Sequence, residues 1–509
     1  MLSQLFNKLQ SVLLRREEKY LYQKFYLKKG KDVVLFYKNW LKNNIKSYKN
    51  KALRYQPLIS IVVNKNGPSD RFLNQCIKSI QGQSYKNWEL LISEKDKTGS
   101  INPKGDFVGF LDIHDFLTPN ALYETVAVLN SQDHIDFIYS DYAILNKHDE
   151  PQDICFLPDF SRYYFLSNPD FIKFGFIRRT LAKKKYFQLK DTHITHIPKV
   201  LYYRRKYLEK KNNTNPKFSI RNDSKTPKPL ISIIIPTSNN WKMLQKCMRS
   251  IEEKSGYNNF EIIIVGNNTS NHEAKEYIDS LRNKYIVLDY SHRFNFSLIN
   301  NYAVKYAKGE FLLFLNDDIE FITDNSLNAM RELFEIKDVG AVGIKLLFPN
   351  NTIQHAGVVV GLNGSADHIY KFINEYADEK KHMLSEGYMK SLVSIREYSA
   401  VTAACMMTRK NLFLKIGGFS EKLKVGFNDV DYCLQCLKSG YRVLYTPHVK
   451  AYHYEHVSRK EIMNKTGDNS ILYHPQDGQL FVTKWGEYIK KGDPYYNPNF
   501  RSDSLVPLL

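Results

Sequence analysis

The chain alternates short apolar runs with amphipathic stretches in two successive blocks. The first block opens with the apolar run 57–63 and the second with the run 229–235. In each block a helical pattern and a further apolar run follow. Such alternation is typical of βαβ units around a mostly parallel sheet. The pattern therefore predicts an α/β fold for both blocks.

The two blocks also resemble each other in sequence. The matching segments are 57–63 with 229–235, 73–80 with 244–251, 88–92 with 260–264, and 105–112 with 309–316. Self-similarity of this kind indicates an internal repeat. The offset between matches grows along the chain, so the first block is the shorter one. We expect two related domains at 57–208 and 229–480, a polar linker at 209–228 and a C-terminal tail at 481–509.

The N-terminal segment 1–56 combines apolar residues at helical spacing with many Lys and Arg residues. Leu2, Leu5, Leu9 and Leu13 follow this spacing, as does the stretch 34–41. One interpretation is a pair of helices that pack on the neighbouring domain. The other is a basic amphipathic surface that lies on anionic lipid headgroups.

Composition and charge narrow the class of partner. The chain has 509 residues, a formal net charge of +20 and a pI near 9.3. This charge favours an anionic partner, such as phosphorylated substrates or an acidic membrane surface. No nucleic-acid-binding motif is present, so we expect no nucleic acid partner.

Compartment and membrane topology follow from what the sequence lacks. No apolar run approaches the ~20 residues that a membrane span requires, and the N-terminus has no signal-peptide pattern. Six cysteines, including Cys433 and Cys436, are too few for a disulfide framework. We expect buried thiols in a reducing, cytoplasmic protein, with possible peripheral contact at the inner face of the membrane.

Two acidic clusters carry the candidate chemistry. Asn316-Asp317-Asp318 follows the apolar run 311–315, and Asn428-Asp429-Val430-Asp431 follows a Gly-Gly-Phe sequence. Ligands of α/β sheets bind at the carboxyl ends of strands, so acids there face a crevice. Carboxylates can hold Mg²⁺ or Mn²⁺ against a diphosphate, and a separate carboxylate can take a proton from a hydroxyl.

Residues 229–459 resemble glycosyltransferase family 2, in particular the bacterial rhamnosyltransferase-like branch that builds surface polysaccharides. The resembling stretches are 231–237, 315–318, 353–358, 399–405, 417–419 and 427–431. The resemblance implies tandem GT-A (Rossmann-like) domains, a dTDP- or UDP-sugar donor, Mg²⁺ or Mn²⁺, and inversion at the anomeric carbon.

The same resemblance assigns roles around the first cluster. Asp318 is expected to ligate the metal, and His453 to complete the metal or diphosphate site. Asp317 is expected to face the donor. Asn316 stands where the usual DXD motif has its first Asp, so one carboxylate is missing.

For the second cluster the resemblance makes Asp429 the catalytic base, with Asp431 orienting it or the acceptor. Arg459 is expected to neutralise the diphosphate. A structural alternative is that Asn428 or Asp429 caps the following helix.

The nucleoside is expected at the ends of the first two strands, near Pro236, Thr237 and Asn267. Gly266 stands where the family often has Asp. His355 has no assignable chemistry and is predicted to be structural. Gly417-Gly418 predicts either a close backbone approach to a sugar or a tight turn.

The first block resembles a degenerate copy of the second. His114 occupies the position of the metal-ligating carboxylate, and Tyr203 is expected at the position of His453. We expect this domain to be an inactive scaffold, although Asp112 and Asp115 remain.

The leading hypothesis is an inverting, metal-dependent glycosyltransferase. It would move a sugar, rhamnose by resemblance, onto a growing surface polysaccharide or polyprenyl-linked glycan. The alternatives are a catalytically inactive scaffold of polysaccharide assembly and a bifunctional transferase that uses both domains.

Overall fold

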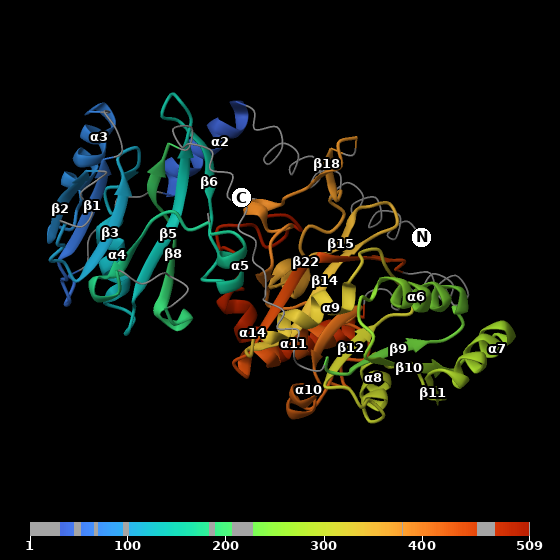
Figure 1. Cartoon of the computed structure of the whole chain (residues 1–509). Helices are drawn as coiled ribbons and strands as arrows, with labels where there is room; N and C mark the ends of the chain where they lie inside the picture. Colours follow the sequence, from blue (N-terminus) through green and yellow to red (C-terminus); the bar gives the residue numbers. More distant parts are fainter. Residues whose placement is uncertain are drawn as a thin grey trace. The chain divides into compact units, whose positions relative to one another are not determined.

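The computed structural model describes residues 31–44, 52–65, 70–94, 101–169, 171–182, 189–205, 228–378, 380–455 and 474–507. These form two compact units. The N-terminal unit comprises 31–205 and 494–500, and the C-terminal unit comprises 228–493 and 501–507. Each unit is built around one mixed sheet with helices (Figure 1), which confirms the predicted α/β fold in two domains.

The N-terminal unit contains eight paired strands in its described part. Its main sheet has the order β2-β1-β3-β7-β5-β8-β4, with β6 paired to β5. The strands are β1 (Ile59–Lys65), β2 (Trp88–Glu94), β3 (Phe107–Asp112), β4 (Phe116–Leu117), β5 (Phe137–Leu145), β6 (Pro151–Cys155), β7 (Gly175–Arg178) and β8 (Ile194–Arg204). The helices are α2 (Lys31–Asn44), α3 (Asp70–Gln81), α4 (Ala121–Leu129) and α5 (Arg162–Ser167).

The C-terminal unit has a larger sheet of related topology. Its strand order is β11-β10-β9-β12-β21-β14-β22-β13, with β15 paired to β14 and β20 paired to β22. These strands are β9 (Ile231–Thr237), β10 (Phe260–Asn267), β11 (Ile286–Tyr290), β12 (Phe311–Leu315), β13 (Ile319–Phe321), β14 (Val339–Leu347), β15 (Ile353–His355), β20 (Arg396–Glu397), β21 (Cys405–Arg409) and β22 (Arg442–His453).

Two small hairpins and seven α-helices complete the described part of this unit. The hairpins are β16 (Val358–Val360) with β17 (Ala366–His368), and β18 (Tyr376–Asp378) with β19 (Met383–Leu384). The helices are α6 (Trp241–Lys254), α7 (His272–Ser280), α8 (Phe296–Val304), α9 (Ser326–Glu332), α10 (Lys410–Ile416), α11 (Asn428–Lys438) and α14 (Pro475–Lys491).

Seven strands of one sheet correspond in order and direction to seven of the other. In the N-terminal unit β1 pairs in parallel with β2 and β3, and antiparallel β7 follows; in the C-terminal unit β9 pairs in parallel with β10 and β12, and antiparallel β21 follows. The same local contacts recur, since the N–H of Gly105 donates to Ser60 Oγ and that of Gly309 to Ser232 Oγ, both at 2.8 Å. A Cβ on either glycine would lie 2.6 Å from the serine nitrogen, which explains glycine at both positions.

Part of the shorter length of the first block is explained between β2 and β3, the strands that correspond to β10 and β12 of the C-terminal unit. In the N-terminal unit β2 ends at Glu94 and β3 begins at Phe107. In the C-terminal unit β10 ends at Asn267 and β12 begins at Phe311, and α7, β11 and α8 lie between them.

Helix α2 packs on the N-terminal unit. Tyr37 and Leu41 are each 5% exposed and contact a cluster that includes Ile154, Phe156 and Val200. Helix α2 therefore agrees with the first interpretation of the N-terminal segment, in which helices pack on the neighbouring domain. The leucines at positions 2–13 lie outside the described residues.

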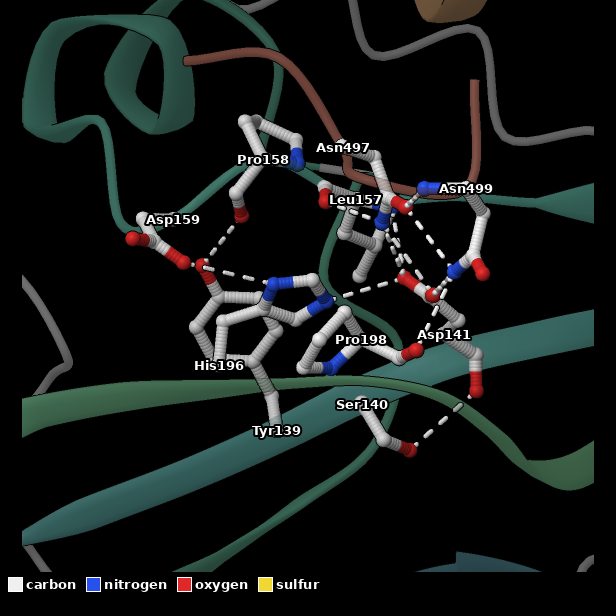
Figure 2. Close-up of polar contacts among 10 residues, drawn as sticks. All are labelled: Tyr139, Ser140, Asp141, Leu157, Pro158, Asp159, His196, Pro198, Asn497 and Asn499. Carbon is white, nitrogen blue, oxygen red and sulfur yellow. Dashed lines mark hydrogen bonds and ion pairs between the residues drawn. The ribbon is translucent and has the colours of Figure 1, made fainter. Parts of the chain in front are cut away.

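A buried polar cluster joins β5, β8 and the segment 494–500 within the N-terminal unit (Figure 2). Asp141 accepts hydrogen bonds from His196 Nε2 at 2.9 Å and from the Leu157 N–H at 2.7 Å. Asn497 Nδ2 donates to both oxygens of Asp141, at 3.0 and 3.1 Å, and to Leu157 O. Amide N–H donors and the His196 ring thus surround a carboxylate that has no exposed surface, which makes its burial tolerable.

The structure also shows the state of the cysteines and the character of the helices. All six cysteines are buried free thiols, as expected from the sequence. Within the described ranges, no helix combines the length and the apolar character that crossing a bilayer requires.

Candidate active site

The acidic turn 316–318 lies where β12 leaves the centre of the C-terminal sheet. Every residue of β12 is buried, and β12 runs parallel to β9, so the ends of the two strands lie side by side. Thr237, the last residue of β9, donates its hydroxyl to Asp317 Oδ2 at 2.7 Å. Two of the residues predicted to contact the donor are therefore in direct contact.

Asp317 lies in an environment that disfavours a second negative charge. Burial and the neighbouring charge of Asp318 raise the pKa of Asp317 to about 7, although the Thr237 hydroxyl opposes the shift. Two adjacent carboxylates with little solvent are stabilised when a cation lies beside them.

Asp318 and His453 are adjacent across an antiparallel strand pair. Ile319 in β13 pairs with His453 in β22, and His453 Nε2 lies 3.3 Å from Asp318 Oδ1. A carboxylate and an imidazole side by side are ligands that suit Mn²⁺ and are compatible with Mg²⁺.

The residues present therefore fit a cation that shares its coordination with the substrate. Among the residues the structure describes, no group of three or more His, Cys, Asp or Glu side chains is placed to enclose a metal ion. Asp318 and His453 would supply the protein ligands, and diphosphate oxygens and water would supply the others. Mg²⁺ in particular is usually bound by one or two carboxylates plus substrate phosphates.

Asp429 lies in the first turn of α11 and is held close to the acidic turn. Its Oδ2 accepts the N–H of Ala403 at 3.0 Å, and its Oδ1 accepts the N–H of Val430 at 2.8 Å. The next residue, Ala404, accepts the N–H of Asn316 at 2.9 Å. The dipeptide 403–404 thus connects Asp429 to the acidic turn, and the two clusters converge.

The backbone immediately before α11 is strained. Phe427 has a φ of +62°, a left-handed conformation that is unfavourable for an aromatic residue. Its ring stacks on Phe481 of α14 with centroids 4.9 Å apart. Such strain persists only where the surroundings impose it, and it often occurs at functional sites. Here it sets the direction in which α11 presents Asp429.

Asp431 occupies a different environment from Asp429. Its carboxylate is fully buried and accepts hydrogen bonds from Trp485 Nε1 at 2.7 Å and Gln435 Nε2 at 3.0 Å. Lys484 Nζ lies 2.6 Å from the same oxygen as Trp485. These contacts anchor α14 to α11. A direct catalytic role for Asp431 stays a prediction.

The predicted nucleoside end lies at the ends of β9 and β10. Asn267 Nδ2 donates to Tyr290 O at 3.0 Å and to His292 O at 2.9 Å, so only its carbonyl oxygen remains to contact a base. Pro236 is half-buried beside Thr237 in β9. A Cβ at Gly266 would meet its nearest neighbour, Thr269 Oγ1, at 3.4 Å, so the site has room for a side chain there.

Other residues singled out in the sequence have structural contacts or lie outside the described part. Gly417 and Gly418 have φ values of +94° and +75°, so this pair makes the tight turn that ends α10. His355 is fully buried and contacts His368. Arg459 lies outside the described residues, so its predicted contact with diphosphate stays a prediction.

The equivalent site of the N-terminal unit has different chemistry. Phe116 pairs with Tyr203 there, as Glu320 pairs with Tyr452 in the C-terminal unit. Arg204, not Tyr203, therefore corresponds to His453, and the sequence expectation was wrong by one residue. The Arg204 guanidinium lies 3.4 Å from Asp115, and His114 Nδ1 lies 2.7 Å from Asp112. A guanidinium has no lone pair to offer a metal ion.

A second arginine fills the same region of the N-terminal unit. Arg205 is 2% exposed and donates to Asp149 Oδ1 at 2.6 Å, to Gln75 Oε1 at 2.7 Å and to His114 O at 2.9 Å. Its guanidinium also lies 4.9 Å from the Phe116 ring centroid. Positive charge thus occupies the place that a cation would need.

Sequence reasoning missed the contribution of α14. Asp477 Oδ2 accepts the N–H groups of Val425 at 2.8 Å and Gly426 at 2.9 Å, and Trp485 and Lys484 bind Asp431. The predicted domain boundary at residue 480 divides α14 between the second domain and the C-terminal tail, because the site motifs end before this helix. A Pro at the first turn followed by apolar spacing was the available signal for a packed helix.

The chain is similar to a family model and to known proteins. Residues 232–357 match the family model described as Glycosyl transferase family 2. The chain is 29% identical over 543 residues to "Uncharacterized protein y4gI" of Sinorhizobium fredii, covering 88% of this chain and 58% of that protein. It is 29% identical over 541 residues to the O-antigen biosynthesis protein RfbC of Myxococcus xanthus, covering 88% of this chain and 40% of RfbC. The chain thus spans less than two thirds of either relative.

Solved structures include a mannosyltransferase, PcManGT from Pyrobaculum calidifontis, in complex with GDP-Man and Mn²⁺. The similarity has a TM-score of 0.36 and 16% identity, and covers 54% of this chain and 68% of that one. The family match itself runs from β9 through β15 and includes the acidic turn. The C-terminal unit therefore contains a segment, residues 232–357, that matches Glycosyl transferase family 2.

Proposed function

We propose that the C-terminal unit is an inverting glycosyltransferase that moves a sugar from a nucleoside diphosphate to a hydroxyl group. The observation that carries this proposal is the convergence of two acidic clusters. Asp318 and His453 form a pair suited to a cation, and residues 403–404 connect that turn to Asp429.

Each acid has a distinct chemical task in this reaction. Asp429 takes the proton of the acceptor hydroxyl, whose oxygen then forms a bond to the anomeric carbon. The bond from that carbon to the diphosphate oxygen breaks on the opposite face, so the configuration inverts. A bound Mg²⁺ or Mn²⁺ would neutralise the charge that develops on the departing diphosphate. No acid is needed for the leaving group, in contrast to the two carboxylates of glycosidases.

The surroundings of Asp429 suit a general base. Its two oxygens accept backbone N–H groups, which fixes the orientation of the carboxylate. The side chain is partly exposed, so an acceptor hydroxyl could reach it. Asn316 makes no side-chain hydrogen bond within the described part of the chain and could contact the donor or its cation.

The substrates are proposed from the resemblance and the relative. We propose a dTDP- or UDP-sugar donor, rhamnose as the sugar, and a surface polysaccharide or polyprenyl-linked glycan as the acceptor. The similarity to a protein of O-antigen biosynthesis supports the polysaccharide acceptor. A cytoplasmic location, with peripheral contact at the membrane where such acceptors are held, is part of the same proposal.

The N-terminal unit is proposed to be non-catalytic. Arg204 and Arg205 carry positive charge at the position of the C-terminal cation site, and their carboxylate partners are Asp115 and Asp149. This favours a single active site over the bifunctional alternative.

The test is release of nucleoside diphosphate from a panel of nucleotide sugars with Mn²⁺ or Mg²⁺. The panel would contain dTDP-rhamnose, UDP-glucose, UDP-galactose and GDP-mannose. We expect one donor to be consumed, and Asp429→Asn to lower turnover at least 100-fold, as losses of general bases do. Turnover that survives this substitution unchanged would contradict the assignment. No turnover with any donor would favour the scaffold.

A further inference from the structure

His355 and His368 form a pair beside the proposed active site. Their Nδ1 atoms lie 2.8 Å apart, and the rings meet edge to face with centroids 4.9 Å apart. The sequence singled out His355 without assigning it any chemistry, and His368 was not singled out at all. The proposed transferase reaction uses neither residue so far.

Strand pairing places His355 on the same face of the sheet as His453. Leu346 of β14 pairs with His355 on one side and with Ala451 on the other. Paired residues point to the same face, and Ala451 and His453 are two positions apart on one strand. His355 therefore faces the side of the sheet that carries the proposed cation ligand.

His368 lies near the residues that hold Asp429. It pairs with Val358, whose N–H donates to Ala400 O at 2.9 Å. Three residues after Ala400, the N–H of Ala403 donates to the Asp429 carboxylate. Burial lowers the pKa of His368, and the charge of Asp429 is among those that oppose this shift, as expected for near neighbours.

The proton shared by the two Nδ1 atoms can lie on either ring. The burial of His355 decides which ring carries it. His355 is 0% exposed, and its Nε2 has no hydrogen-bond partner within the described part of the chain. If His368 donated to His355, a neutral His355 would carry its proton on this buried Nε2. A buried N–H without an acceptor is rare and costly, whereas a buried lone pair is tolerated better.

His355 Nδ1–H is therefore the donor and His368 Nδ1 the acceptor. Because one ring nitrogen sets the state of the other, neutral His368 carries its own proton on Nε2. His368 is partly exposed, and its side chain makes no hydrogen bond other than that to His355 within the described residues. Its Nε2–H can therefore donate to a ligand.

We propose that His368 donates its Nε2–H to a sugar hydroxyl beside Asp429, and that His355 is the positioning residue that fixes this tautomer. The proposal rests on the proposed transferase function and adds the group that recognises the sugar. The hydroxyl belongs either to the donor sugar or to a sugar acceptor, since both are bound next to the base.

The test compares His368→Leu with His368→Gln. Leucine fills similar space without a donor, and glutamine places an N–H at about the reach of Nε2. With the donor found in the panel, we expect His368→Leu to lower kcat/KM about 10-fold or more, the size of a lost hydrogen bond to substrate. His368→Gln should recover most of it. Affinity for Mn²⁺ with UDP or dTDP alone should stay at the wild-type value, because those ligands lack the transferred sugar. The Tm of His368→Leu should fall, because buried His355 loses its acceptor, so the assays are run well below that Tm.

Two assays distinguish the source of the hydroxyl. If His368→Leu lowers kcat/KM for donor hydrolysis in the absence of acceptor, the hydroxyl belongs to the donor sugar. If it lowers kcat/KM only for transfer to a panel of methyl glycosides, the hydroxyl belongs to the acceptor. Wild-type kcat/KM for His368→Leu in both assays would overturn the inference while leaving the transferase intact. A wild-type protein that consumes no donor would instead overturn the proposed function.

The role of His355 has its own readout. His355→Leu removes the donor that fixes the tautomer, so we expect kcat/KM to fall several-fold while nucleotide affinity is kept. If His355→Leu lowers the Tm but leaves kcat/KM unchanged, His355 is structural only, and the positioning part of the proposal is wrong.

Discussion

The carboxylate of Asp477 accepts the backbone N–H of Gly426 at 2.9 Å, so the start of α14 holds the loop that leads into α11. The same oxygen accepts the N–H of Val425 at 2.8 Å. Three residues after Gly426 comes Asp429, the proposed base. Helix α14 thus braces this loop at one point and Asp431 at another.

Removing this brace should impair chemistry more than donor binding. Asp477→Ala leaves two partly buried N–H groups without their acceptor, which costs up to about 1–3 kcal/mol, and it lets the loop before Asp429 shift. We expect kcat to fall about 10-fold or more, since small misplacements of a base are costly, with little change in donor KM. Steady-state kinetics would measure this. The control is Glu487→Gln on an exposed position of the same helix, and an equal loss there would contradict the brace.

Asp318 should control the metal-dependent part of nucleotide binding. Asp318→Asn removes the carboxylate beside His453, so we expect the affinity for UDP or dTDP in the presence of Mn²⁺ to fall about 10-fold or more. Affinity without metal should change little. Calorimetric titration with and without Mn²⁺ separates the two. An unchanged Mn²⁺ effect would show that Asp318 is not a ligand.

The acids of the N-terminal unit should be dispensable for turnover. Asp112→Asn with Asp115→Asn removes the carboxylates beside His114 and Arg204. We expect kcat/KM within about twofold of wild type, measured well below the Tm, and a lower Tm because Arg204 loses its partner. Loss of a second linkage among the products would instead support two active sites.

Asn497 should stabilise the N-terminal unit through Asp141. Asn497→Ala removes hydrogen bonds to both oxygens of a fully buried carboxylate, and bonds to charged groups contribute about 1.5–3 kcal/mol. We expect an unfolding free energy lower by about that amount in urea titrations, with faster amide exchange in β5 and β8. Asn499→Ala is the matched control, since its contact with Asp141 is longer, 3.4 Å. Equal losses of unfolding free energy in Asn497→Ala and Asn499→Ala would contradict the larger role assigned to Asn497.

The stability of the N-terminal unit should depend on pH through His196. Burial lowers the pKa of His196, but the charges and hydrogen bonds of Asp141 and Asp159 outweigh it and raise the pKa to about 9. A folded pKa above the unfolded value of ~6.5 means that the contribution is complete below pH 6.5 and is lost as the pH approaches 9. Unfolding followed at pH 6.5 and 9.5 should show this loss, and His196→Gln should remove it. A pH-independent wild type would contradict the ion pair.

Much of the fold followed from local pattern. Apolar runs such as 311–315 became buried strands, and the α/β prediction is confirmed. The antiparallel strands β7 and β21 were not predicted, because strand order depends on long-range pairing that hydrophobicity does not encode. The one-residue error at Tyr203 has the same origin, since register is set by pairing and a shift of one moves every side chain.

The candidate site was predictable where a motif sits on a strand end. Thr237 with Asp317, and Asp318 with His453, were expected to share a site and are in contact. Asp477, Trp485 and His368 carry no sequence signature, because their importance comes from partners that are distant in the chain. The commitment of the Asn267 amide to two carbonyl oxygens was likewise visible only in three dimensions.

The late position of Asn497 has a consequence for biogenesis. Asp141 is separated from Asn497 by 356 residues, yet both belong to the same buried cluster of the N-terminal unit. The ribosome therefore completes the whole C-terminal sheet before it supplies the last piece of the N-terminal core. Until then Asp141 has only part of its hydrogen-bonding shell, so the unit made first cannot complete its core until nearly the whole chain has been made.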